Sequence, residues 1–289
     1  MTSIPKPIMP QLASQKYGKD RVRVLRVVRR PGGLHTVHEV EASVALEGDF
    51  SAAYLSDNNS KVVPTDTMKN TVHLLAQKHL GDVIEDFALA LTRHFLARYP
   101  QVSRATIRLT SRPWDRLHDP DGGAYPHTFT ARATSTPTCS VVATRSEETI
   151  QSGVKDVLIL NSTASAFAGF AQCDYTTLPE TNDRILATRM EATWTYAPGA
   201  TAFTKANTVI LAALLSTFAK EFSPSVQNTL FLMGKAALAA CADITEIHLA
   251  MPNKHYLPIN FAPFQLENNN EIFLPTDEPH GQIEATVTR

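Results

Sequence analysis

The first half of the chain contains segments in which apolar and polar residues alternate, the period-two pattern of half-buried strands. The first two cover residues 21–28 and 40–46, and the Pro-Gly-Gly sequence at 31–33 predicts a turn between them. Alternation returns over residues 102–109 and 128–133. We therefore expect a strand at each of these places. Upstream, the proline-rich residues 1–15 predict a loose arm.

Between these strands, apolar residues recur at three- and four-residue spacing, which predicts two helices. One begins near Thr65 and Asp66, with either residue as its N-cap, and runs to about Lys78. The other opens at Asp82, and Glu85 three residues later completes a capping-box pattern. The apolar stripe of this second helix consists of Ile84, Phe87, Ala88, Leu91 and Phe95.

The second half repeats this order of elements. The first of its two helices carries an apolar stripe, and the second starts at Ser223-Pro224, with the serine as N-cap and the proline at the first helical position. The stripe consists of Phe203, Ala206, Ile210, Leu214 and Phe218. Strands are predicted over residues 139–144, 154–160, 189–196, 244–251 and 282–288.

Strands, two helices and strands, twice over, predict a tandem duplication of α+β class. We expect antiparallel sheets with helices packed on one face. The boundary is placed near residues 136–145, which gives a first domain over 1–140 and a second over 141–289. The run at 157–160 is apolar on both faces of its strand, which favours burial of the second face inside an oligomer.

Composition excludes several classes of partner and location. The chain has 289 residues, of which 43% are apolar and 19% charged, enough for one large or two medium domains with a full core. A net charge of −1, without a charged block, argues against nucleic acid or a membrane surface as the main partner. We find no membrane-span pattern and no signal peptide. The end at Arg289 lacks a Ser-Lys-Leu peroxisomal address, so a cytoplasmic location is expected.

The sequence carries no recognisable metal or phosphate motif. Its three cysteines are far apart and lack CxxC spacing, so we predict reduced thiols and no zinc ribbon or disulfide framework. His35 and His38 would point to opposite faces of a strand, which argues against a shared metal. There is also no glycine-rich phosphate loop and no nucleophile elbow.

The segment over residues 167–188 combines aromatic rings with one fixed-charge arginine. Phe167 and Phe170 belong to an apolar run, and Arg184 lies at the start of an alternating strand. A ring for stacking and a guanidinium for paired hydrogen bonds are what a site needs to hold a flat, oxygen-bearing heterocycle. The simpler alternative is a solvated arginine at a strand end.

Other polar residues also have both a chemical and an ordinary interpretation. His255, just past a strand, could shuttle protons or lie in a surface turn. Asn253 could orient an oxygen or form an Asx turn. Gln227 and the N–H of Val226, early in a helix, suit a carbonyl-bearing ligand, although a solvent-facing residue is more common there. Lys19 is most simply an exposed loop lysine.

Several of these residues lie in motifs that, taken in order, resemble the urate oxidase family over nearly the whole chain. The resemblance implies two tandem T-fold domains, assembled as a homotetramer around a barrel-like tunnel. It implies oxidation of urate by O2 and water to 5-hydroxyisourate and hydrogen peroxide, with no metal or organic cofactor. The motifs are Tyr17-Gly18-Lys19-Asp20, Thr65-Asp66-Thr67, the segment 167–188, Ser225-Val226-Gln227, and the segments 249–256 and 281–287.

The resemblance implies that residues of the second half hold the purine. Arg184 and Gln227 would grip its opposite edges with paired hydrogen bonds. Phe167 would stack on the ring, and Leu178 and Val226 would complete the wall. A purine or pterin enzyme of another T-fold type, with a glutamate anchor, and a binder without activity stay open as alternatives.

The resemblance also implies a proton relay formed by Lys19, Thr65 and His255. Asp66 would help at the imidazole end of the purine, and Asn253 would contact the O2 or water site. Residues 19, 65 and 66 belong to the first domain and the others to the second, and in this family the two groups meet across a subunit interface. The departures from the family, which are Ala168, Pro179 and a short tail, leave every polar position of the site in place.

Overall fold

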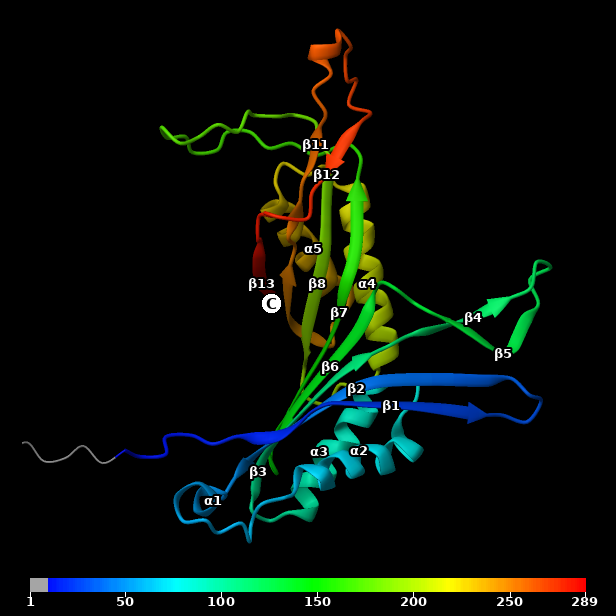
Figure 1. Cartoon of the computed structure of the whole chain (residues 1–289), viewed down its shortest axis with the longest axis vertical. Helices are drawn as coiled ribbons and strands as arrows, with labels where there is room; N and C mark the ends of the chain where they lie inside the picture. The colour runs from blue at the N-terminus through cyan, green and yellow to red at the C-terminus, as the bar shows by residue number, and fades with distance from the viewer. Residues whose placement is uncertain (1–9) are drawn as a thin grey trace, which may run out of the picture.

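One long antiparallel sheet organises the molecule. The computed structural model describes residues 10–289, so most of the expected N-terminal arm lies outside the described residues. The sheet has nine strands, all paired antiparallel, and β10 (Asn253–Lys254) joins it beside β8. The long strands of the sheet run through both halves of the molecule (Figure 1). Across the sheet the other strands follow the order β1 (Tyr17–Arg29), β2 (His35–Gly48), β3 (Val102–Ser111), β6 (Thr136–Ala143), β7 (Glu148–Asn161), β8 (Leu186–Tyr196), β9 (Ile244–Ala250) and β13 (Glu284–Thr288).

Two small hairpins project from this sheet (Figure 1). One pairs β4 (Trp114–His118) with β5 (Ala124–Ala131), and the other pairs β11 (Tyr256–Pro258) with β12 (Phe273–Pro275). The strand predicted over 128–133 overlaps β5. The other strands of these hairpins escaped prediction because they are short and bury too little to show an alternating pattern.

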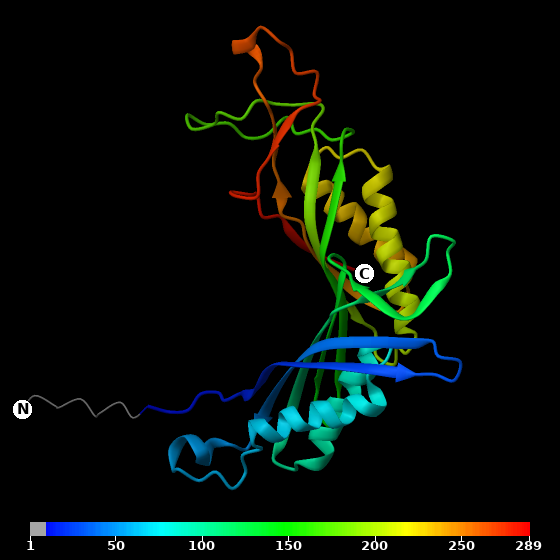
Figure 2. The ribbon, with the colours of Figure 1, turned by 45° about the vertical axis from the view of Figure 1, so that its right-hand side comes forward.

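Two pairs of helices cover the same side of the sheet (Figure 2). The first pair, α2 (Thr65–His79) and α3 (Ile84–Arg98), packs on strands of the first half, and the second pair, α4 (Phe203–Lys220) and α5 (Val226–Ala240), on strands of the second half. A short helix, α1 (Ser51–Leu55), and a 3-10 turn (Ala262–Phe264) complete the set. Both predicted apolar stripes are buried, which confirms the helix phases.

The first helix begins at Thr65 as predicted, but the predicted N-caps of the first two helices are wrong. Pro64 precedes α2 as its N-cap and no side chain caps the helix, so neither Thr65 nor Asp66 has that role. In α3 no side-chain cap forms either, and the capping box expected between Asp82 and Glu85 does not exist. The reason is tertiary: Glu85 is turned into the core.

The start of α5 also differs from the prediction. Its N-cap is Ser225, whose hydroxyl oxygen accepts a hydrogen bond from the N–H of Asn228 at 3.2 Å. Ser223 and Pro224 therefore precede the helix. Gln227 is the second residue of α5, where backbone N–H groups are still free to point at a ligand.

The sheet continues without a break through the predicted domain boundary. Residues 140 and 141 lie inside β6, which pairs with β3 on one side and β7 on the other. Glu85 on α3 accepts hydrogen bonds from Ser152 on β7 and from Asn207 on α4, the latter at 2.8 Å. A buried carboxylate thus joins the two helix pairs. The division at 140/141 stays a prediction.

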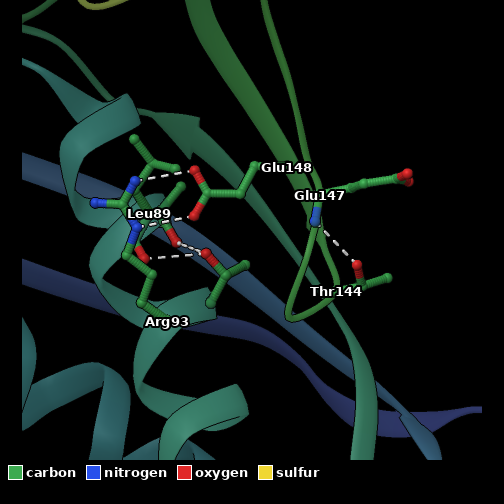
Figure 3. Close-up of polar contacts among 7 residues, drawn as sticks. Leu89, Arg93, Thr144, Glu147 and Glu148 are labelled. Atoms are coloured by element: carbon green, nitrogen blue, oxygen red, sulfur yellow. Dashed lines mark hydrogen bonds and ion pairs between the residues drawn. The ribbon is translucent and has the colours of Figure 1, made fainter. Parts of the chain in front are cut away.

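An ion pair reinforces this junction near the surface. Arg93 on α3 donates two parallel hydrogen bonds to Glu148 at the start of β7, at 2.8 and 2.9 Å (Figure 3). Thr144 caps the neighbouring turn by accepting from the N–H of Glu147 at 3.1 Å. Bidentate arginine–carboxylate pairs fix geometry as well as charge. Within residues 10–289, none of the helices has the length and apolar content needed to cross a bilayer.

Candidate functional site

A cavity of about 410 Å³ lies where the loop between β7 and β8 meets the residues around β10 and β11. Five of the residues singled out from the sequence line it together: Phe167, Leu178, Arg184, Asn253 and His255. They come from segments about 70 residues apart, and the strand pairing of β10 with β8 brings them together.

The loop between β7 and β8 folds back on itself and so places Phe167 near Arg184. The N–H of Phe167 donates to the carbonyl oxygen of Thr181 at 2.8 Å, and the N–H of Thr181 returns the bond at 3.0 Å. The N–H of Arg184 donates to the carbonyl oxygen of Ser165 at 2.9 Å. Both side chains therefore reach the same cavity.

Arg184 carries a partly buried positive charge with unused donors. Its guanidinium carbon lies 5.3 Å from the centre of the Phe167 ring, and its Nε–H donates to the Ser165 hydroxyl at 3.3 Å. Burial lowers the pKa of Arg184, although arginine remains charged at neutral pH. Among the residues described, no carboxylate is within ion-pair distance of this guanidinium. The terminal nitrogens are thus available to a ligand.

Backbone pairing also brings the start of α5 next to the segment that carries Phe167. The N–H of Ala166 donates to the carbonyl oxygen of Ser223 at 2.8 Å, and the N–H of Ser223 donates to that of Ala164 at 2.9 Å. Val226 is buried and Gln227 exposed just beyond. Neither lines the cavity, so the structure places these two predicted residues beside it.

The segment with Asn253 and His255 is fixed through its backbone. The N–H of Asn253 donates to the carbonyl oxygen of Gly281 at 2.8 Å. The carbonyl oxygen of His255 accepts from both the N–H and the hydroxyl of Thr276, at 2.9 and 3.1 Å. With the backbone held in this way, the side chains of both residues border the cavity.

Lys19, Thr65 and Asp66 form a separate group in the first half. The Tyr17 hydroxyl accepts from the N–H of Val63 at 2.8 Å and donates to its carbonyl oxygen at 3.2 Å, which ties the start of β1 to the start of α2. The hydrogen bond and charge of Lys69 lower the pKa of Asp66, and the charge of Lys19 adds to this. None of the three residues lines the cavity.

Sequence reasoning passed over other residues of the cavity. Glu180, Tyr256 and Phe273 line it, and none was singled out beforehand. Glu180 and Tyr256 lie inside the family motifs 167–188 and 249–256, and this position could have marked them as candidates. Phe273 lies on β12, a strand that was not predicted. No three side chains among His, Cys, Asp and Glu are grouped to hold a metal within the described part of the chain.

Comparison with known proteins gives one consistent result. A model of the uricase family matches residues 15–142 and 150–284. The chain is 38% identical to a uricase of Dictyostelium discoideum, over 97% of this chain and 98% of that protein. It is 39% identical to uricase-2 of Phaseolus vulgaris, over 95% of this chain and 94% of that one.

The structural comparison agrees with the sequence comparison. The crystal structure of uricase from Arthrobacter globiformis superposes with a TM-score of 0.92 at 34% identity, covering 98% of this chain and 96% of that one. This likeness confirms the predicted fold of two tandem T-fold domains. Family model, relatives and structure all extend over nearly the full length. The chain therefore belongs to the uricase family.

Proposed function

We propose that this chain oxidises urate with O2 and water to 5-hydroxyisourate and hydrogen peroxide. The proposal rests chiefly on one cavity, which is lined by the ring of Phe167 and by Arg184, Asn253 and His255. Among the described residues, no carboxylate is paired with the guanidinium of Arg184. Membership of the uricase family supports the same reaction. The proposal is stronger than that of a purine binder without activity, because the polar residues implied for the relay are all present.

The pocket suits a flat, oxygen-rich anion. Two terminal nitrogens of Arg184 would donate paired hydrogen bonds to one edge of the purine, and Gln227 would hold the opposite edge. Phe167 would stack on the ring, and Leu178 and Val226 would close the wall. Each contact fixes the plane or the orientation of the purine, so its reacting carbon would face Asn253 and the O2 or water site.

The chemistry assigned to the protein is proton transfer. Urate is electron-rich, and once deprotonated it can supply two electrons to O2, which leaves as hydrogen peroxide while water adds to the ring. Lys19, Thr65 and His255 would remove and return the protons, with Asp66 at the imidazole end of the purine. The positive charge of Lys19 near the Thr65 hydroxyl would lower the cost of moving the hydroxyl proton. On this proposal no metal or organic cofactor takes part.

The location of the relay leads us to propose a shared site in a homotetramer. Lys19, Thr65 and Asp66 do not line the cavity, so a neighbouring subunit would supply them. The sheet ends in open edges at β1 and β13, and Leu158 and Leu160 on β7 are 47% and 44% exposed. Open edges and exposed apolar strand faces favour association with further copies. A cytoplasmic location stays a prediction.

The deciding experiment follows the loss of urate's ultraviolet absorbance in a buffer without added cofactor, before and after exhaustive dialysis against EDTA. Turnover that survives chelation is the expected result. An inactive chain contradicts the proposed function. Activity that disappears on chelation and returns with copper or iron leaves the reaction in place and refutes its independence of metal.

A further inference from the structure

The stacking ring of the proposed site is itself held by a second ring. Phe170 stacks on Phe167, with ring centres 4.9 Å apart and ring planes 14° apart. Phe167 lines the cavity, whereas Phe170 is not among the lining residues and contacts the Phe167 ring from outside that lining. A near-parallel pair of this kind limits how far the front ring can tilt.

A tight turn makes this stacking geometrically available. Gly169, between the two rings, has a φ of +69°, in the left-handed region that favours glycine. A Cβ at this position would meet no atom within 4 Å, so backbone conformation, and not crowding, is the reason for glycine here. The turn brings Phe170 back over Phe167 within three residues.

One side chain from across the loop holds the turn. The N–H of Gly169 donates to a carboxylate oxygen of Glu180 at 2.8 Å. Among the described residues, no other hydrogen bond reaches residues 168–170. Glu180 also lines the cavity and is not ion-paired with Arg184. Its carboxylate therefore sets the position of the turn without neutralising the guanidinium.

We propose that Glu180 and Phe170 are positioning residues for Phe167, which they hold in the orientation that stacks on the purine. The proposal rests on the proposed function and deepens it, because it names what orients the ring. A ring already fixed loses little freedom when the ligand arrives, so the support strengthens binding. Among the described residues, neither side chain hydrogen-bonds to Lys19, Thr65 or His255, so proton transfer should be affected far less.

Five variants test this on the purified oligomer: Glu180→Ala, Glu180→Gln, Phe170→Ala, Phe170→Tyr, and Asp174→Ala as the matched control. Asp174 is an exposed acid of the same loop. The Kd of xanthine, a planar purine that lacks one oxygen of urate, is measured by calorimetry, together with KM and kcat for urate. Both alanine variants at 180 and 170 should raise Kd and KM by about two- to tenfold and change kcat by less than about twofold. Glu180→Gln keeps an oxygen acceptor for the Gly169 N–H, and Phe170→Tyr keeps the ring that stacks on Phe167. Both variants should therefore have wild-type values.

The outcomes separate this inference from the function on which it rests. Wild-type Kd and KM in Glu180→Ala would overturn the inference, as would a Glu180→Gln variant as weak as Glu180→Ala, since the charge would then be the active feature. If Phe170→Ala does not fold, the two variants of the exposed residue Glu180 decide the test alone. A wild-type chain that neither binds xanthine nor oxidises urate overturns the proposed function and the inference together. Active wild type with unaffected variants overturns the inference alone.

Discussion

Arg184 illustrates how a single side chain can be prepared for a ligand that carries oxygen. Its guanidinium is partly buried over the Phe167 ring, and within residues 10–289 the Ser165 hydroxyl is its only side-chain hydrogen-bond partner. Burial without a counter-charge is unfavourable, and the lowered pKa of this group reflects it. Purine oxygens that accept its free N–H groups would offset that penalty.

Replacing Arg184 should therefore weaken urate binding before it affects chemistry. Arg184→Ala should raise KM and lower kcat/KM by about 10- to 100-fold, the effect of losing hydrogen bonds to a charged group. Arg184→Lys keeps the charge but not the paired donors, so it should recover only part of the loss. Steady-state kinetics with urate measures both. An unchanged KM in Arg184→Ala would remove this residue from the binding site.

Lys19 should have the opposite kinetic signature. Lys19→Ala should lower kcat by about 10²- to 10⁴-fold, the range for a lost acid–base group, while xanthine still binds. Lys61, an exposed lysine of the first half that pairs with Asp49, gives the control variant Lys61→Ala, which should behave as wild type. If Lys19→Ala keeps normal turnover at every pH tested, the proton relay is assigned to the wrong residues.

At the level of elements, the cap of α5 couples stability to the proposed site. The Ser225 hydroxyl satisfies one free N–H of this helix, next to Val226 and Gln227. Ser225→Ala should cost about 0.5–2 kcal/mol of stability, and Ser225→Asn should cost little because asparagine also caps. Unfolding midpoints in denaturant compare the two. Equal midpoints for Ser225→Ala and wild type would mean that the cap contributes nothing.

Element type was predictable because the apolar stripes repeat over many residues. The stripe from Phe203 to Phe218 fixed the phase of α4 and is buried as expected. Helix starts were less predictable, because tertiary contacts decide them. The buried side chain of Glu85 accepts hydrogen bonds from Ser152 and Asn207 and so cannot form the predicted capping box. The backbone of Ser223 is hydrogen-bonded to Ala164 and Ala166 and lies outside the helix.

The residues proposed for the site were predictable only where they lie in motifs that resemble the family. Resemblance named Phe167, Arg184, Asn253 and His255, and the cavity does bring these residues together. From the residues alone each had an ordinary alternative. The bond between Glu180 and Gly169 joins residues 11 apart in an irregular loop, where no periodicity signals a contact.

For the whole molecule, the central observation is that the residues proposed for the site fall into two separate groups. Lys19, Thr65 and Asp66 belong to one half of the chain, and the cavity belongs to the other. In a two-fold pair, each site would combine one subunit's first half with its partner's second half. Lesions in different halves should then complement each other.

Co-refolding two inactive chains tests this. One carries Lys19→Ala and Thr65→Ala, and the other Arg184→Ala and His255→Ala. Each alone should be nearly inactive. An equal mixture should recover about a quarter of wild-type activity, because half of random pairs are mixed and each mixed pair has one intact site of two. The same chains refolded apart and then combined serve as the control. Mixtures shown to contain mixed oligomers but still inactive would place each site within one chain.

Because Lys19 and Thr65 lie outside the cavity, a site shared between subunits predicts that the reaction rate falls on dilution, which an enzyme with its whole site in one chain would not show. Subunits that separate would each keep Phe167, Arg184 and His255 in one cavity and lose the partner's Lys19 and Thr65. Mass action then makes specific activity fall as total protein falls, even at saturating urate. The concentration of the protein would itself control its activity, and hydrogen peroxide would be made only where the subunits are concentrated enough to assemble.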